Sequence, residues 1–215
     1  HSDNTFYTIR EIKQFLKYDD VLDIGAHLGY FSCIAGRLAA NGKVHVFEVD
    51  PKCIELIHKN LKANQLNNVE VHNYAVSDSK GTIKIPNLKN PNPSLVINSN
   101  NDVNYLEIES ISVDEFVAQQ GITPKFIKID VEGAEWQVLC GMKKIIAEKS
   151  PNILVEIHVD KLRQSFDTDY KIIIEFLLNA GYAIEEIEHR NANGNPRKVD
   201  LDTQLKGNTR VLCTQ

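Results

Sequence analysis

Three carboxylates lie within six residues of one another in the run Lys128-Ile129-Asp130-Val131-Glu132-Gly133-Ala134-Glu135-Trp136. The run joins a strand-like segment to a helical pattern, so Asp130, Glu132 and Glu135 are expected where a strand becomes a helix. Acidic side chains at a helix start also suit the helix dipole, and one or two of them can be purely structural. Three carboxylates exceed what capping requires, which indicates a binding or catalytic role.

His158 ends the next strand-like segment, in Glu156-Ile157-His158. Ligands of parallel α/β sheets bind beyond the carboxyl ends of the strands, so His158 is expected to face the same crevice as the three carboxylates. An imidazole titrates near neutral pH and can therefore accept a proton from a substrate. A lone histidine is usually structural, and this predicted position makes a catalytic role equally reasonable.

A glycine turn lies earlier in the chain, in Asp23-Ile24-Gly25-Ala26-His27-Leu28-Gly29. Gly25 and Gly29 permit a tight turn and a close approach of the backbone to a ligand, and the following helix offers free N–H groups to an anion. A dinucleotide fingerprint would require glycine at positions 27 and 30, where this chain has His27 and Tyr30. This difference disfavours a nicotinamide-dependent oxidoreductase, which stays the alternative with a different chemistry.

Two further segments follow strand-like runs. Glu48 comes 19 residues after Gly29, and a carboxylate at that strand end can accept two hydrogen bonds from a ribose diol. Asn73 and Ala75 lie in Asn73-Tyr74-Ala75-Val76-Ser77-Asp78, where a small residue such as Ala75 leaves room for an adenine ring. These segments and the glycine turn together indicate a site for a nucleoside-containing ligand.

The elements that must position these residues are short strands alternating with amphipathic helices. Strands are expected at 21–24, 44–47, 69–74, 126–129, 153–157, 182–187 and 209–214. Asp50 and Pro51 predict one helix start, and Ser112 with Glu115 predicts another through a capping box. This alternation implies right-handed βαβ units and a parallel sheet that is covered on both faces.

Two polar stretches interrupt the alternation. Residues 87–104 lie between possible strands at 81–86 and 105–111, and residues 189–208 precede the last strand. Both stretches are expected to be loops, either solvated surface or a lid that selects the substrate. Residues 1–18 are a lead-in, and the whole chain of 215 residues is expected to be one domain.

Composition narrows the class of protein. The formal net charge is −5, and no apolar run approaches the roughly 20 residues of a membrane-spanning helix, so neither nucleic-acid nor membrane binding is expected. None of the four cysteines forms a C-x-x-C pair or a zinc-binding spacing with histidine, and no metal is expected. A cytoplasmic location is favoured, and a homodimer is compatible with the sequence.

The runs VLDIGAHLGYFS, VHVFEVDP, NYAVSD, FIKIDVEGAEWQVLCGM and ILVEIH resemble the FkbM-type S-adenosylmethionine-dependent methyltransferases of class I. The resemblance extends from about Val21 to Tyr182, and I-D-V-E-G-x-E is its most specific part. It implies a Rossmann-like α/β three-layer sandwich, with a mostly parallel seven-stranded sheet whose last strand is antiparallel. The family pattern usually has asparagine at position 27, where this chain has His27.

The resemblance also implies S-adenosyl-L-methionine as the cofactor and a role for each residue. The cofactor-binding residues would be Asp23, Gly25, His27, Gly29, Glu48, Asn73, Ala75 and Asp130. Within this set, Glu48 would hold the ribose hydroxyls, Ala75 would flank adenine and Asp130 would approach the methionine moiety. The acceptor pocket and the catalytic groups would be provided by Glu132, Glu135 and His158.

The predicted reaction is methyl transfer to a hydroxyl of a small molecule, sugar or natural product. Displacement at the sulfonium requires the acceptor oxygen to be held at about 3 Å, and a base that takes its proton accelerates the reaction by roughly 10²–10⁴-fold. His158 or one of the carboxylates can be that base. A methyltransferase for protein or nucleic acid is an alternative, disfavoured by the acidic chain, and a non-catalytic module that keeps the fold is another.

Overall fold

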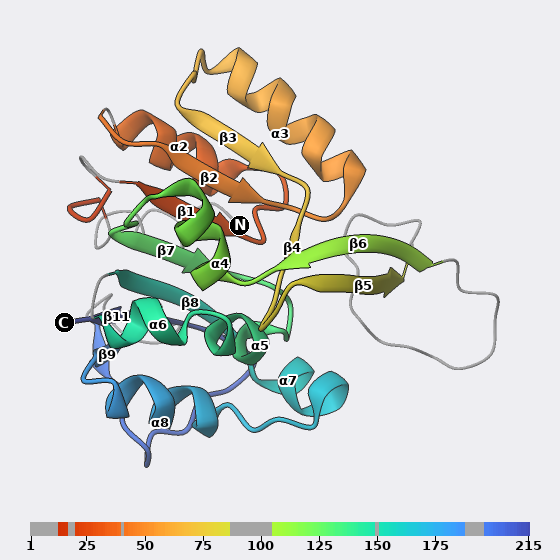
Figure 1. The fold of residues 1–215 in the computed structure, drawn as a ribbon. Helices are drawn as coiled ribbons and strands as arrows, with labels where there is room; N and C mark the ends of the chain where they lie inside the picture. Colours follow the sequence, from red (N-terminus) through yellow and green to blue (C-terminus); the bar gives the residue numbers. More distant parts are fainter. Residues whose placement is uncertain (1–12, 17–19, 40, 87–104, 149–150, 188–195) are drawn as a thin grey trace.

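The computed structural model describes residues 13–16, 20–39, 41–86, 105–148, 151–187 and 196–215. Within this part of the chain, eight strands form one sheet in the order β10-β9-β11-β8-β7-β1-β2-β3 (Figure 1). The strands are β1 (Val21–Ile24), β2 (Val44–Phe47), β3 (Val69–His72), β7 (Phe126–Ile129), β8 (Asn152–His158), β9 (Ala183–Glu186), β10 (Arg197–Lys198) and β11 (Asn208–Thr214). Strands β1, β2, β3, β7 and β8 are parallel, and β11 is antiparallel to both β8 and β9.

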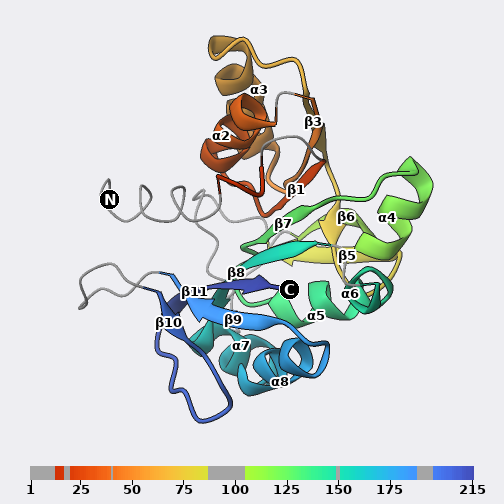
Figure 2. The ribbon, with the colours of Figure 1, turned by 90° about the vertical axis from the view of Figure 1, so that its left-hand side faces the viewer.

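Helices cover both faces of this sheet, so the molecule has three layers (Figure 2). One face carries α2 (Tyr30–Leu38) and α3 (Pro51–Ala63). The other carries α4 (Val113–Gln120), α5 (Glu135–Cys140), α6 (Lys143–Ala147), α7 (Val159–Phe166) and α8 (Lys171–Asn179). Neighbouring residues of β1 therefore enter different cores, since Val21 belongs to the buried cluster that contains Ala35 and Leu22 belongs to the one that contains Leu139. Burial on both faces explains why three of the four residues of β1 are apolar, with Asp23 as the exception.

Both helix starts expected from capping are confirmed. The Asp50 carboxylate accepts a hydrogen bond from the backbone N–H of Lys52 at 2.8 Å, and Pro51 is the first helical residue. The Ser112 hydroxyl accepts one from the backbone N–H of Glu115 at 3.1 Å. Each cap satisfies an N–H group that the helix itself leaves without a partner.

The expected mostly parallel sheet with an antiparallel last strand is confirmed, but the expected number of seven strands is wrong by one. The additional strand is β10, two residues inside the stretch 189–208 that was expected to be a loop. It pairs with the edge of β9, where Arg197 donates to Glu186 at 2.5 Å. The expected strand at 69–74 ends at His72, because the Asn73 side chain leaves the sheet to donate to the carbonyl of Glu48.

A second sheet holds the segment between β3 and α4. Its strands are β4 (Ala75–Val76), β6 (Tyr105–Ile111) and β5 (Gly81–Pro86), paired in the order β4-β6-β5. The possible strands at 81–86 and 105–111 are thereby confirmed. The pair β5–β6 extends from the carboxyl edge of the main sheet (Figure 1), and the predicted loop 87–104 that joins them lies outside the described residues, as do residues 189–195 of the other stretch.

Two histidines lie against each other between β2 and β3. His45 is 1% exposed, and its Nδ1 lies 3.1 Å from Nε2 of His72. Both rings contact the ring of Phe116 on α4. Burial lowers the pKa of both His45 and His72, because it disfavours the charged form of an imidazole. The fold is therefore built for two neutral imidazoles.

This pair should make the protein less stable in mildly acidic solution. A histidine whose pKa is lowered by folding binds protons mainly in the unfolded state, so its stabilising contribution is present above about pH 6.5 and is lost as the pH falls below it. We expect His72→Asn to flatten the decrease in unfolding free energy between about pH 7.5 and 5.5, measured by urea denaturation. His58→Asn, at an exposed position of α3, is the matched control. Equal slopes for wild type and His72→Asn would contradict this account.

Candidate active site

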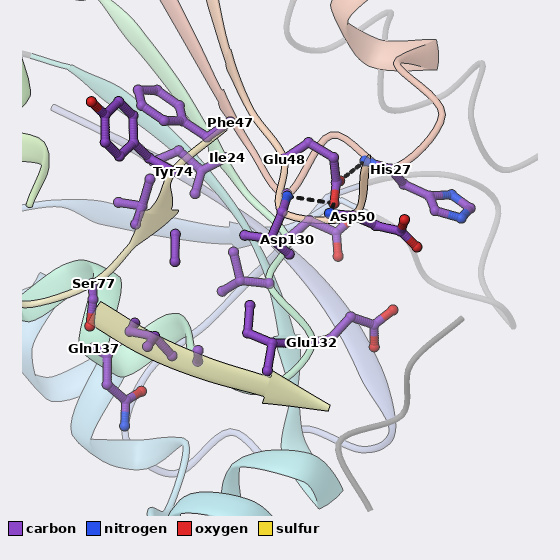
Figure 3. A pocket seen from close by; sticks show the side chains of 18 of the residues that line it. Ile24, His27, Phe47, Glu48, Asp50, Tyr74, Ser77, Asp130, Glu132 and Gln137 are labelled. Atoms are coloured by element: carbon purple, nitrogen blue, oxygen red, sulfur yellow. Dashed lines mark hydrogen bonds between the residues drawn. The ribbon is translucent and has the colours of Figure 1, made fainter. Parts of the chain in front are cut away.

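A cavity of about 410 Å³ opens at the carboxyl edge of the main sheet. Its lining comes from the ends of β1, β2 and β7, from the segment after β3, and from Ile83, Lys84 and Ile85 of β5. Figure 3 shows Phe47 and Tyr74 at one end of the cavity and Glu132 toward the other. The order of the strands reverses at β1, which has β2 and β7 as neighbours, so the cavity lies where such sheets bind ligands.

The glycine turn has the left-handed backbone that its sequence suggested. Gly25 has φ +78°, and a Cβ built there would lie 1.9 Å from the carbonyl oxygen of Asp130. His27 also has a positive φ of 52°, and histidine and asparagine are among the few non-glycine residues that adopt it readily. Histidine at position 27, in place of the asparagine of the family pattern, therefore preserves the backbone of the turn. Gly29, with φ +75°, packs on the side chain of Ile57 rather than on the cavity.

Glu48 is held by three backbone N–H groups. Its carboxylate accepts from His27 at 2.6 Å, from Val49 at 2.8 Å and from Asp50 at 2.9 Å (Figure 3). Burial raises the pKa of Glu48, and the three backbone hydrogen bonds act in the opposite direction. A carboxylate offers about four acceptor positions, so one is left for a ligand in the cavity that Glu48 lines.

The segment after β3 contributes in two ways. Ala75 lines the cavity together with Tyr74 and Val76. Asn73 does not line it; its side-chain amide donates to the carbonyl of Glu48 at 3.0 Å. Ala75 thus lies at the cavity, where a residue that flanks adenine would have to be. Asn73 instead supports the backbone of Glu48.

Asp23 lies beneath the cavity and does not line it. The side chain is fully buried, where it accepts a hydrogen bond from the Ser32 hydroxyl at 2.5 Å and one from the Lys128 ammonium at 3.2 Å. Burial alone would lower the pKa of Lys128, but the charges of Asp23 and Asp130 outweigh it and raise the pKa. Lys128 was not predicted as a site residue, although a lysine within the short apolar run 126–129 was a signal in the sequence.

Glu135 and His158 form a buried pair. The Glu135 carboxylate accepts from His158 Nδ1 at 2.7 Å and from the backbone N–H of Gly133 at 2.9 Å. Glu135 is 0% exposed and His158 is 1% exposed, so neither belongs to the cavity lining, unlike Asp130 and Glu132. Both were expected at the acceptor pocket, and the structure places them behind its lining, where α5 turns the Glu135 side chain toward β8.

The other ring nitrogen of His158 faces three carboxylates. Its Nε2 lies 3.3 Å from Glu132, 3.9 Å from Asp130 and 4.0 Å from Glu156. Burial would lower the pKa of His158, but the hydrogen bond to Glu135 and the negative charges of Glu135, Glu132 and Asp130 outweigh it and raise the pKa. The imidazole is thus held in one orientation, with Nδ1 bound and Nε2 directed at the acidic turn.

Glu156 is a further residue near the site that was not predicted from the sequence. It lies two residues before His158 on β8, on the same face of the strand, and this spacing was the available signal. Its carboxylate accepts from Arg210 Nε of β11 at 2.6 Å. Asp130, Glu156 and His158 offer ligand atoms within 4.8 Å of one another, and so do His45, Glu70 and His72 outside the site. Either group could hold a metal ion.

The fold and this site together define a Rossmann-like α/β protein of the kind used by class I methyltransferases. The match of residues 23–184 to the model of the methyltransferase FkbM domain shows that the chain belongs to the FkbM methyltransferase family. Among solved structures, the methyltransferase FkbM of Methylobacillus flagellatus has a TM-score of 0.58 at 18% identity, covering 91% of this chain and 43% of that one. A precorrin-6y C5,15-methyltransferase from Geobacter metallireducens has a TM-score of 0.53 at 14% identity, covering 99% and 88%.

Two curated relatives are similar in sequence. The hexuronic acid methyltransferase AglP of Haloferax volcanii is 33% identical over 157 residues, which cover 70% of this chain and 61% of AglP. The methyltransferase sdnD of Sordaria araneosa is 27% identical over 169 residues, covering 63% of this chain and 65% of sdnD. The chain therefore spans less than two thirds of the length of either relative. None of its described helices is long and apolar enough to cross a membrane.

The contact between Gly25 and Asp130 predicts a large effect of adding one methyl group. Gly25→Ala must accommodate both a left-handed φ and the close carbonyl oxygen, so we expect it to lower the unfolding free energy by about 3 kcal/mol or more. Gly121→Ala is the matched control, because Gly121 has φ +65° with nothing within 4 Å of its Cβ position. It should lose only about 1–2 kcal/mol. Urea denaturation measures both, and equal losses would refute the importance of the contact.

Proposed function

We propose that this chain is an S-adenosylmethionine-dependent O-methyltransferase that acts on a hydroxyl of a sugar or another small natural product. The observation that carries the proposal is the buried hydrogen bond between Glu135 and His158, which directs Nε2 at the acidic turn beside the cavity. Membership of the FkbM methyltransferase family supports the reaction class. The name of AglP, a hexuronic acid methyltransferase, supports a carbohydrate acceptor, and the name of sdnD supports methyl transfer.

In this proposal the glycine turn and the strand ends hold the cofactor. Gly25 and His27 contact its amino-acid part, while Asp23 and Gly29 support the turn from below and from the side of α3. The free acceptor position of Glu48 receives a ribose hydroxyl, with Asn73 fixing the backbone of Glu48. Adenine lies on the wall made by Ala75 and Tyr74, and Asp130 approaches the methionine moiety. Negative charge there favours a sulfonium cation.

The catalytic groups act on the acceptor side. Glu132 lines the cavity beside His158 Nε2, where it accepts a hydrogen bond from a hydroxyl of the acceptor. The methyl group passes from sulfur to the acceptor oxygen, and the hydroxyl proton goes to Nε2. Glu135 stabilises the imidazolium that forms and keeps the proton of Nδ1 in place. The scheme includes no metal, since Lys128, Lys161 and Arg210 already pair with Asp130, Glu132 and Glu156.

Location and partners are part of the same proposal. All four cysteines are free thiols, which favours a reducing compartment such as the cytoplasm. The partner is a small-molecule or glycan acceptor rather than a nucleic acid, because the chain carries a net charge of −5. We propose that the enzyme is a monomer or a homodimer and that it does not bind a membrane. We propose the chain as one methyltransferase domain that includes residues 1–18 and the stretches 87–104 and 189–208.

The cofactor is tested by calorimetry with S-adenosylmethionine, S-adenosylhomocysteine and NAD. We expect the first two to bind and NAD not to bind. Glu48→Ala should weaken S-adenosylmethionine binding by about tenfold or more, because a buried carboxylate that accepts from the ribose is lost. Glu55→Ala, an exposed glutamate on α3, is the control and should bind as wild type does. Binding of NAD alone would favour the oxidoreductase, and binding of no cofactor would overturn the proposal.

The base is tested with methyl-labelled cofactor and a panel of sugars, uronic acids and small hydroxylated acceptors. His158→Gln should slow turnover by roughly 10²–10⁴-fold, whereas the Kd for the cofactor should change by less than about threefold. His58→Gln is the exposed control. Unchanged turnover in His158→Gln would exclude His158 as the base. Transfer of the methyl group to a carboxylate of the acceptor would contradict a hydroxyl acceptor, and a carboxylate needs no base.

The pH profile gives a separate test of Glu135. Turnover requires neutral His158, whose pKa is raised above the ordinary value of about 6.5, so kcat should still be increasing at pH 6.5 and should level off only at higher pH. Glu135→Gln removes the negative charge that raises this pKa, so the rise should move to lower pH while the plateau falls. A profile that keeps its midpoint in Glu135→Gln would show that Glu135 does not act on His158.

A further inference from the structure

The two turns of the site touch through their backbones. Asp23 and Lys128 are register partners on the parallel strands β1 and β7, as are Ile24 and Ile129. The backbone N–H of Asp130 donates to the carbonyl of Ile24 at 3.0 Å, directly after the strands end. The position of the acidic turn is thus tied to that of the glycine turn.

One ammonium group connects the polar atoms of both turns. Lys128 Nζ lies 3.1 Å from the carbonyl oxygen of Gly25, 3.2 Å from Asp23 Oδ1 and 3.5 Å from Asp130 Oδ2. Two of the three N–H donors of the ammonium are used in hydrogen bonds to Gly25 and Asp23, and Asp130 lies at ion-pair distance. The Lys128 side chain is only 14% exposed, which leaves water little share in this network.

The contact also orients the carboxylate of Asp130. Its Oδ2 faces Lys128, and its Oδ1 lies 3.9 Å from His158 Nε2. Asp130 lines the cavity, whereas Asp23 does not. Lys128 therefore touches one carboxylate that is buried below the site and one that is presented to the ligand.

We propose that Lys128 is a positioning residue for the cofactor, which it affects by fixing the Asp130 carboxylate and the Gly25 carbonyl. This inference rests on the proposed use of S-adenosylmethionine. Lys128 itself contacts no ligand in this account. Its ammonium prevents the Asp130 carboxylate from rotating toward water, so that the methionine moiety meets a site already in its binding geometry. The competing explanation is that Lys128 only offsets the buried charge of Asp23.

A double-mutant cycle on cofactor affinity separates the two explanations. The variants are Lys128→Met, Asp130→Asn and the two combined, and the measurement is the Kd for S-adenosylmethionine by calorimetry. Each single variant should weaken binding by about tenfold. The Kd of the double variant should be within about threefold of that of the single variant that binds more weakly. The effects are non-additive because Lys128 acts through Asp130. Lys125→Met, an exposed lysine just before β7, is the control and should bind as wild type does.

Two results would overturn the inference. One is a double variant whose Kd is raised by the product of the two single effects, on the order of a hundredfold, because the free-energy effects of independent sites add. The other is a Lys128→Met variant that binds within about threefold of wild type. If Lys128→Met fails to fold, the same cycle is measured in an Asp23→Asn background, where no buried aspartate charge is left unpaired. Absence of binding by the wild type would instead refute the proposed function.

Discussion

The ion pair between Lys128 and Asp23 is the interaction on which the rest of the site depends. It lies inside the main sheet, between β1 and β7, where either charge alone would be strongly destabilising. The glycine turn begins two residues after Asp23, and the acidic turn begins two residues after Lys128. The absence of a side chain at Gly25 lets the two turns meet, so neither can shift without disturbing the other.

Local signals in the sequence predicted the framework well. Caps and apolar runs identified the helix starts at Pro51 and Val113 and the strands of the parallel sheet, because these signals act between near neighbours. The rule that ligands bind at strand ends also selected Glu48 and Asp130, which do line the cavity. Such residues are predictable because the position of a strand end follows from the run itself.

The burial of individual side chains and their partners on other strands were not predictable in the same way. Asp23 and Glu135 carry the residue types of a binding site, yet both are fully buried and bind other side chains. The partner of Asp23 is 105 residues away in the chain, and Arg210 is 54 residues from Glu156. Spacing along one strand indicates the face of a side chain, but it contains no information on which distant segment of the chain forms the neighbouring strand.

The position of β11 has a consequence for how the chain folds during synthesis. This strand lies between β8 and β9, although it follows both in the sequence. When the growing chain has emerged from the ribosome as far as the end of β9, the strand that pairs with both β8 and β9 is still missing. Both strands then keep an unpaired edge. Exposed strand edges promote association with other chains. Completion of the sheet must therefore wait for Asn208–Thr214 to emerge, which places its final assembly after most of the domain has been translated.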